Sequence, residues 1–265
     1  MDLIVNGARL HYTVDGEGDP IVFAHGLLWS GEMYQFQVAS LRARHRCVTF
    51  DFRGQGESEV TATGYDMDTL ALDAAALIER LGCAPCHFVG LSMGGFVGLR
   101  LALRRPDLLR SLTLIESAAD GEPRGNVPRY RAMAFVTRLF GVRPLVGRVM
   151  RIMFGRTFLA DAERRGLRAE MERRLLGNDV TGMRRALEGV ITRAPVDEAL
   201  PLIRTPTLVL SGSEDVAVVP ARSRATADKI PNSRFQSIPR AGHTSTIEEP
   251  IAVTSALASF FSSLK

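Results

Sequence analysis

The most constraining feature of this chain is a serine set among glycines where a predicted strand turns into a predicted helix. Residues 90–95 read GLSMGG, a G-x-S-x-G pattern. An apolar, β-prone run precedes them at 86–89, and a run compatible with a buried helix follows at 96–103. Glycines permit the sharp turn that this junction needs, because side chains there would collide with neighbouring backbone. The turn would expose the Ser92 hydroxyl above a helix N-terminus, whose free N–H groups favour a developing negative charge.

The rest of the chain predicts the sheet on which this turn would sit. From residue 20 onward, strand-like and helix-like segments alternate, which is typical of a mostly parallel sheet with helices on both faces. Before that, apolar runs flank Asn6 and Gly7, a pair typical of hairpin turns, and predict an antiparallel edge hairpin. The eight predicted strands are 3–5, 10–14, 20–24, 46–50, 86–89, 111–115, 207–210 and 234–238. The predicted helices are 33–43, 68–81, 96–103, 220–230 and 248–262.

One long segment interrupts the alternation. Residues 119–199 are helical in composition, rich in Arg, Met and Leu, and punctuated by glycine and proline. We interpret them as a helical cap inserted into a single α/β core. The core would then consist of residues 1–118 and 200–265.

Composition excludes several other classes of protein. No run approaches the ~18 uninterrupted apolar residues of a membrane span, and the first residues do not resemble a signal peptide. Three cysteines argue against a disulfide scaffold and favour a reducing, cytoplasmic setting. Cys83 and Cys86 form a C-x-x-C pair, but no second pair stands at zinc spacing, so we expect no metal.

The net charge of +4 does not by itself indicate a nucleic-acid partner. Only Lys229 and Lys265 are lysines, so 31 of the 33 basic residues are arginines, and these are scattered among carboxylates. A solvated, arginine-rich surface explains the charge, and we expect neither nucleic acid nor a membrane as partner. The sequence leaves the oligomeric state open.

A serine nucleophile needs a base, and the base needs an orienting acid. His243 is the one histidine after the insertion, and it follows the last predicted strand. Asp215 follows the preceding strand, with Glu214 beside it as a competing acid. Sites in doubly wound sheets gather at the carboxyl ends of strands, where all three candidates fall.

These motifs, in this order, resemble the α/β-hydrolase superfamily over nearly the whole chain. Residues 90–95 resemble its nucleophile elbow, His25 and Gly26 its oxyanion-loop motif, and residues 51–58 its D-x-R-G-x-G-x-S turn. The resemblance implies Ser92, His243 and Asp215 as nucleophile, base and acid. It also implies that the backbone N–H groups of Leu27 and Met93 form the oxyanion hole. His25 would shape the loop, and the 51–58 turn would be structural.

Two alternative sites remain open at this point. Some members of the superfamily take the acid from the strand after the nucleophile helix, where this chain has Glu116 and Asp120. Gly54 and Gly56 lack the third glycine of a dinucleotide fingerprint, which argues against a nicotinamide-dependent oxidoreductase.

The resemblance implies a hydrolase of a small carboxylic ester or (enol-)lactone that acts without metal or organic cofactor. The alternatives are a cofactor-free perhydrolase of the haloperoxidase type, a carbon–carbon-bond hydrolase, and a ligand receptor on a hydrolase fold. Serine rather than aspartate as nucleophile argues against dehalogenases and epoxide hydrolases. His25, Gly26 and Trp29 are candidates for the substrate pocket. The arginines of the insertion would suit an anionic acyl group, but their density is more simply explained by a chain that uses arginine for nearly every cation.

Overall fold

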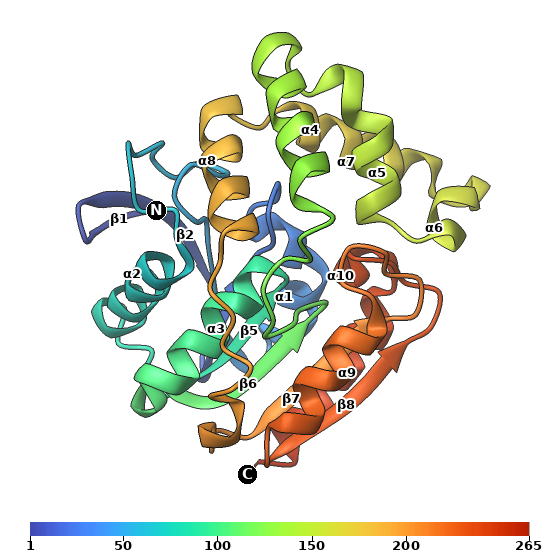
Figure 1. Ribbon diagram of the computed structural model, residues 1–265. Helices are drawn as coiled ribbons and strands as arrows, with labels where there is room; N and C mark the ends of the chain where they lie inside the picture. The colour runs from blue at the N-terminus through green and yellow to red at the C-terminus, as the bar shows by residue number, and fades with distance from the viewer. Residues whose placement is uncertain (265) are drawn as a thin grey trace.

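The computed structural model of the protein describes residues 1–264, and its centre is one eight-stranded sheet (Figure 1). The strand order is β1-β2-β4-β3-β5-β6-β7-β8. All neighbours from β4 to β8 pair in parallel, whereas β1 and β2 pair antiparallel with each other and β2 with β4. The strands are β1 (Asp2–Val5), β2 (Ala8–Asp15), β3 (Asp19–Ala24), β4 (His45–Phe50), β5 (Cys86–Leu91), β6 (Leu109–Ile115), β7 (Thr207–Gly212) and β8 (Ser233–Ile238). This confirms the predicted fold class.

The first two strands form the predicted edge hairpin. Val5 pairs with Ala8, and the turn between them consists of Asn6 and Gly7 at φ of 46° and 74°. Two successive positive φ values define the tight turn that matches strand twist, and asparagine followed by glycine tolerates them best.

Two apolar layers cover the two faces of the sheet, as the near-continuous apolar strands predict. Successive side chains of a strand point to opposite faces. In β3, Val22 and Ala24 therefore join the core cluster that includes α2 (Met67–Arg80) and α3 (Met93–Arg104). Ile21 and Phe23 join the other cluster, with α1 (Gln35–Leu41) and α11 (Pro250–Ser262). Helix α9 (Pro220–Lys229) packs on β7 and β8.

Two of the predicted helices are broken. The stretch predicted as 33–43 begins with a 3-10 turn, η1 (Gly31–Tyr34), and ends with α1 at Leu41. The stretch predicted as 248–262 starts at the last residue of α10 (Ser245–Glu248) and continues, after a break, as α11. The break lies at Glu249, at φ −132° and ψ 62°, because a residue that precedes proline is excluded from helical backbone.

The segment between β6 and β7 is helical, as predicted. Its helices are α4 (Val127–Phe140), η3 (Arg143–Leu145), α5 (Val146–Met153), α6 (Arg156–Ala160), η4 (Ala162–Arg164), α7 (Arg165–Leu176) and α8 (Val180–Ile191). In Figure 1 these helices gather beyond the end of the sheet toward which the arrows of β6 and β8 point. We call α4 to α8 the inserted helices. The remaining short turns of the fold are η2 (Pro106–Leu108) and η5 (Leu200–Leu202). Across residues 1–264, no helix has both the length and the apolarity to cross a bilayer.

Candidate active site

Ser92 occupies a strained turn between β5 and α3. Its φ of 50° and ψ of −110° are unusual for a residue with a side chain, a conformation that costs about 1–3 kcal/mol. The neighbouring glycines make the turn possible. A Cβ on Gly90 would lie 2.3 Å from the Gly94 carbonyl oxygen, and a Cβ on Gly94 would lie 2.1 Å from that of Ala24. Larger residues at either position would push the helix off the sheet.

Backbone hydrogen bonds hold this turn against the next strand. The Ser92 N–H donates to the Ile115 carbonyl at 2.8 Å, and the Ser92 carbonyl accepts from the Ser117 hydroxyl at 3.0 Å. The side chain of Ser92 is therefore fixed at the edge of the sheet, with the residue 8% exposed.

His243 and Asp215 form the hydrogen-bonded pair that the sequence predicts. His243 Nδ1 lies 2.8 Å from Asp215 Oδ2, and both residues are buried. The other carboxylate oxygen of Asp215 accepts the N–H groups of Ala217 at 2.8 Å and Val218 at 3.1 Å. These donors orient the Asp215 carboxylate so that its other oxygen faces Nδ1 of the imidazole.

The competing acids are bound elsewhere. Glu214 accepts hydrogen bonds from Thr157 in α6, and Asp120 pairs with Arg222 at 2.7 Å. Glu116 is fully buried, and its carboxylate accepts the Gly212 N–H at 2.6 Å. Burial and the nearby Asp215 raise the pKa of Glu116 well above its usual value, which favours its neutral form. Among the acids considered, the hydrogen bond to His243 belongs to Asp215.

The loop after β3 lies against the Ser92 turn. A Cβ on Gly26 would lie 3.5 Å from the Cβ of Ser92, so this loop approaches the serine closely. His25 Nδ1 lies 2.7 Å from the Gly26 carbonyl, and Nε2 accepts the Phe52 N–H at 3.0 Å. Burial lowers the pKa of His25, and this pattern of one donor and one acceptor suits the neutral ring. His25 thus shapes the loop.

The turn at residues 51–58 also holds the loop after β3 through hydrogen bonds. Asp51 accepts the N–H groups of Gly31 at 2.7 Å and Glu57 at 2.9 Å, while Gln55 Oε1 accepts the Leu28 N–H at 2.8 Å. The turn is itself tied to α2 by a buried pair between Arg53 and Asp73. Its contacts are structural, as the sequence predicts.

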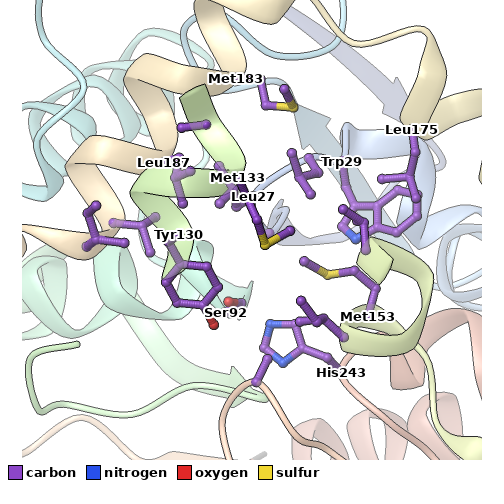
Figure 2. A pocket seen from close by; sticks show the side chains of 18 of the residues that line it. Leu27, Trp29, Ser92, Tyr130, Met133, Met153, Leu175, Met183, Leu187 and His243 are labelled. Atoms are coloured by element: carbon purple, nitrogen blue, oxygen red, sulfur yellow. The ribbon is translucent and has the colours of Figure 1, made fainter. Parts of the chain in front are cut away.

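Ser92 and His243 both line one cavity, of about 1060 Å³ with its open mouth included (Figure 2). Figure 2 shows the two side chains together at one end, with the apolar side chains spread over the rest. Gly26, Leu27 and Trp29 form part of the wall, whereas His25 does not. The inserted helices supply side chains that the sequence did not single out: Tyr130, Met133, Met153, Leu175, Met183 and Leu187.

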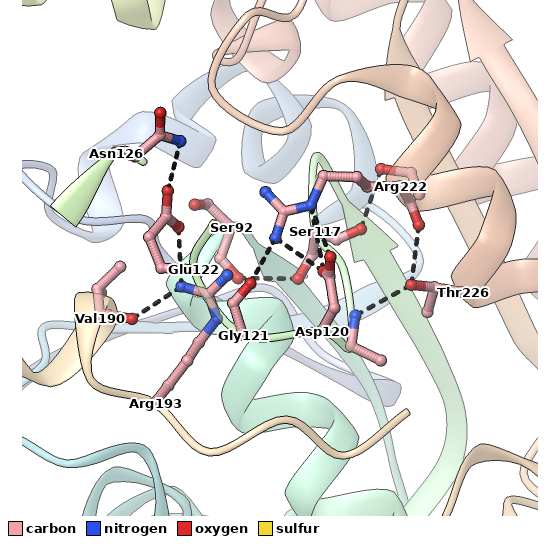
Figure 3. Close-up of polar contacts among 12 residues, drawn as sticks. Ser92, Ser117, Asp120, Gly121, Glu122, Asn126, Val190, Arg193, Arg222 and Thr226 are labelled. Atoms are coloured by element: carbon pink, nitrogen blue, oxygen red, sulfur yellow. Dashed lines mark hydrogen bonds and ion pairs between the residues drawn. The ribbon is translucent and has the colours of Figure 1, made fainter. Parts of the chain in front are cut away.

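The charged wall residues besides His243, within the described chain, are Glu122 and Arg184. Glu122 accepts hydrogen bonds from Arg193 at 3.1 Å and from Asn126 at 2.9 Å, as Figure 3 shows. The Arg193 guanidinium also lies over the Phe96 ring, 4.0 Å from its centre. This pair joins the two ends of the insertion beside α3. No sequence motif marks it, since the partners are 71 residues apart.

Comparison with known proteins identifies the family to which this chain belongs. A sequence model described as "alpha/beta hydrolase fold" matches residues 19–250. A curated relative from Mycobacterium tuberculosis H37Rv, named "Putative non-heme bromoperoxidase BpoC", is 36% identical over an alignment of 270 positions that covers 97% of this chain and 99% of the relative.

Solved structures agree over nearly the whole chain. The enol-lactonase from Burkholderia xenovorans LB400 is 31% identical with a TM-score of 0.91, covering 99% of this chain and 100% of the enzyme. A thermophilic esterase from Thermogutta terrifontis is 28% identical with a TM-score of 0.91, covering 99% and 97%. The chain therefore belongs to the α/β-hydrolase family.

Proposed function

We propose that the protein is a serine hydrolase of carboxylic esters or lactones, with Ser92, His243 and Asp215 as its triad. The observation that carries this proposal is the 2.8 Å contact between His243 and Asp215, with His243 lining the same cavity as Ser92. His243 would take the proton of the Ser92 hydroxyl as the serine attacks the substrate carbonyl. Asp215 would stabilise the imidazolium that results.

The oxyanion of the tetrahedral intermediate would be bound by the backbone N–H groups of Leu27 and Met93. Met93 is the first residue of α3, and the first N–H groups of a helix have no acceptor within it. Protonated His243 would then release the leaving alcohol or enolate and leave an acyl group on Ser92. Water activated by His243 would attack this acyl group and free the acid.

The cavity wall favours an apolar acyl group. We propose that the inserted helices form a cap and that their Met, Leu and Tyr side chains select an uncharged substrate. Most arginines of the insertion lie on the outside, and the two wall charges, Glu122 and Arg184, have opposite signs, with Glu122 already paired to Arg193. This disfavours the anionic acyl group that the arginine content had suggested.

The relative named as a bromoperoxidase supports one alternative on the same triad. In a perhydrolase, hydrogen peroxide replaces water in the attack on the acyl group, and a peracid leaves instead of the acid. Both reactions require Ser92, so they differ only in the second step. A carbon–carbon-bond hydrolase is a further use of this triad.

A panel of uncharged aryl esters and lactones, with a fluorophosphonate probe, tests the proposal. We expect the probe to label the protein at Ser92 and hydrolysis to require that serine. Ester turnover that survives Ser92→Ala, or no labelling of the wild type, contradicts the proposal. Peracid formation with acetate and peroxide that outpaces ester hydrolysis would favour the perhydrolase.

A further inference from the structure

A single buried carboxylate holds the backbone on both sides of His243. Glu248, with none of its surface exposed, accepts the Gly242 N–H at 2.9 Å on Oε2 and the Thr244 N–H at 3.0 Å on Oε1. A third N–H, that of Gly155, donates to Oε2 at 2.7 Å. All three partners of the Glu248 carboxylate are backbone N–H groups, and an ionised carboxylate can accept from all of them. A neutral acid would turn an O–H toward N–H groups.

The third donor belongs to the inserted helices. Gly155 lies between α5 and α6, and the loop of His243 packs so tightly on it that a Cβ on Gly242 would lie 2.2 Å from the Gly155 nitrogen. The Thr244 hydroxyl adds a hydrogen bond to the Met153 carbonyl at 2.7 Å. The Met153 side chain lines the cavity. One short stretch of the insertion thus contacts both the cavity and the backbone of the proposed base.

The loop that carries the proposed acid is attached to the same stretch. Glu214 accepts the Thr157 N–H at 2.8 Å and the Thr157 hydroxyl at 2.6 Å. Two carboxylates, each close in sequence to a proposed triad residue, therefore join the acid and base loops to residues 153–157.

We propose that Glu248 is the positioning residue of His243. Its carboxylate locks the base loop onto the α5–α6 junction, so the imidazole is aligned with Ser92 only while the inserted helices are seated. This inference rests on the proposed role of His243 as base. Glu248 contacts neither substrate nor nucleophile in this scheme and acts through the backbone of residues 242–244.

The charges around Glu248 make this lock sensitive to pH. Asp215 from the β7 loop and Glu116 after β6 are acidic neighbours, and the carboxylates of Glu214 and Glu248 both approach Gly155. His243 stands on the same loop, and the Arg164 guanidinium donates to the backbone carbonyl of Glu248. Burial, with a smaller effect of Asp215, raises the pKa of Glu248 to about 7. Acidification through pH 7 would therefore protonate Glu248 and weaken its hydrogen bonds to the base loop, so kcat would fall as the pH drops through this value.

The variant Glu248→Gln tests the proposal with Glu249→Gln as matched control. The control is the adjacent acid, which pairs with Arg164 and Arg240 near the surface. For E248Q we expect kcat to fall about 10- to 100-fold with KM within about threefold, because small displacements of a catalytic group cost this much. The fall in kcat that the wild type shows as the pH drops through about 7 should be absent from the pH profile of E248Q, because the titrating carboxyl is gone. E249Q should match the wild type in all these measurements.

A proton NMR signal gives a readout that does not depend on turnover. The hydrogen-bonded Nδ1–H of His243 should resonate far downfield in the wild type and should shift or broaden in E248Q but not in E249Q. If E248Q does not fold, Thr244→Val removes the hydroxyl contact to Met153. It should lower kcat and shift the His243 signal by less than E248Q would, and it should keep the wild-type pH dependence because Glu248 is unchanged.

The outcomes separate the two proposals. A folded E248Q with unchanged kcat, pH profile and His243 signal overturns the positioning role, as does an equal loss in E249Q. Activity that survives Ser92→Ala overturns the proposed function instead, whatever the NMR signal does.

Discussion

The Ser92 turn and the inserted helices are held in place by different means. At the turn, backbone packs on backbone: added Cβ atoms on Gly90 and Gly94 would lie 2.3 Å and 2.1 Å from backbone oxygens. Within the insertion, Gly125 and Gly166 have open space in the same position. The turn that carries Ser92 thus tolerates no added side chain at its glycines. The inserted helices, in which we propose the substrate is selected, have room for such changes. The insertion approaches backbone closely only where it meets the core, as at Gly155.

Replacing Ser92 is the strongest test of whether the turn carries the proposed reaction. We expect Ser92→Ala to lower kcat for an apolar aryl ester by about 10⁴- to 10⁶-fold, because loss of a triad serine removes the covalent route. The melting temperature should change little, since the turn depends on its glycines. Steady-state kinetics on protein purified free of other esterases measures this, with Ser262→Ala as the control. A loss below about tenfold would show that the turn does not carry the reaction.

A pair of glycine substitutions tests whether the Ser92 turn is packed more tightly than the inserted helices. Gly94→Ala would place a Cβ 2.1 Å from the Ala24 carbonyl oxygen, and we expect a loss of more than about 3 kcal/mol in unfolding free energy, or no folded protein. Gly166→Ala lies in α7 with open space around it, so it should be neutral or should stabilise by up to about 1 kcal/mol. Urea titration of both variants measures the difference. Equal losses would mean that the two regions are packed alike.

Two adjacent leucines test whether the insertion selects the substrate. Leu175 is 1% exposed and lines the cavity, whereas Leu176 is 38% exposed. Leu175→Ala should cost about 2–4 kcal/mol of stability and leave additional cavity space. Its kcat/KM should shift about tenfold toward longer or bulkier acyl groups, while Leu176→Ala keeps the wild-type preference. An acyl-chain series from acetate to octanoate measures this shift. An unchanged preference in both variants would locate specificity outside this wall.

The smallest effect concerns pH and stability at the contact between the two regions. The pKa of Glu248 rises from 4.5 in the unfolded chain to about 7 in the fold, so the folded state binds more protons between these values. Its contribution to stability is full below pH 4.5 and is lost as the pH rises through 7. The unfolding free energy of E248Q should therefore gain on that of the wild type by about 1–3 kcal/mol between pH 4 and pH 8. Thermal melts across this range measure it; a constant difference would contradict the raised pKa.

The sequence predicted the features that depend on local pattern. Alternating apolar runs gave the eight strands, Asn6 and Gly7 gave the edge hairpin, and the glycines around Ser92 gave the sharp turn. The insertion was found because its composition departs from the alternation. The breaks at Tyr34 and Glu249 were missed, although proline at 250 was a signal for the second.

The glycine-flanked turn at Ser92 and the placement of Ser92, Asp215 and His243 at one edge of the sheet follow from the sequence alone, because strand ends of a parallel sheet share one edge. Only the tertiary structure decided which acid reaches the imidazole. Asp215 lies against His243, whereas its chain neighbour Glu214 accepts a hydrogen bond from Thr157. It also decided the apolar wall and the contact between Gly155 and Glu248. That contact joins residues 93 positions apart, and no local pattern records which buried carboxylate will meet which free N–H group.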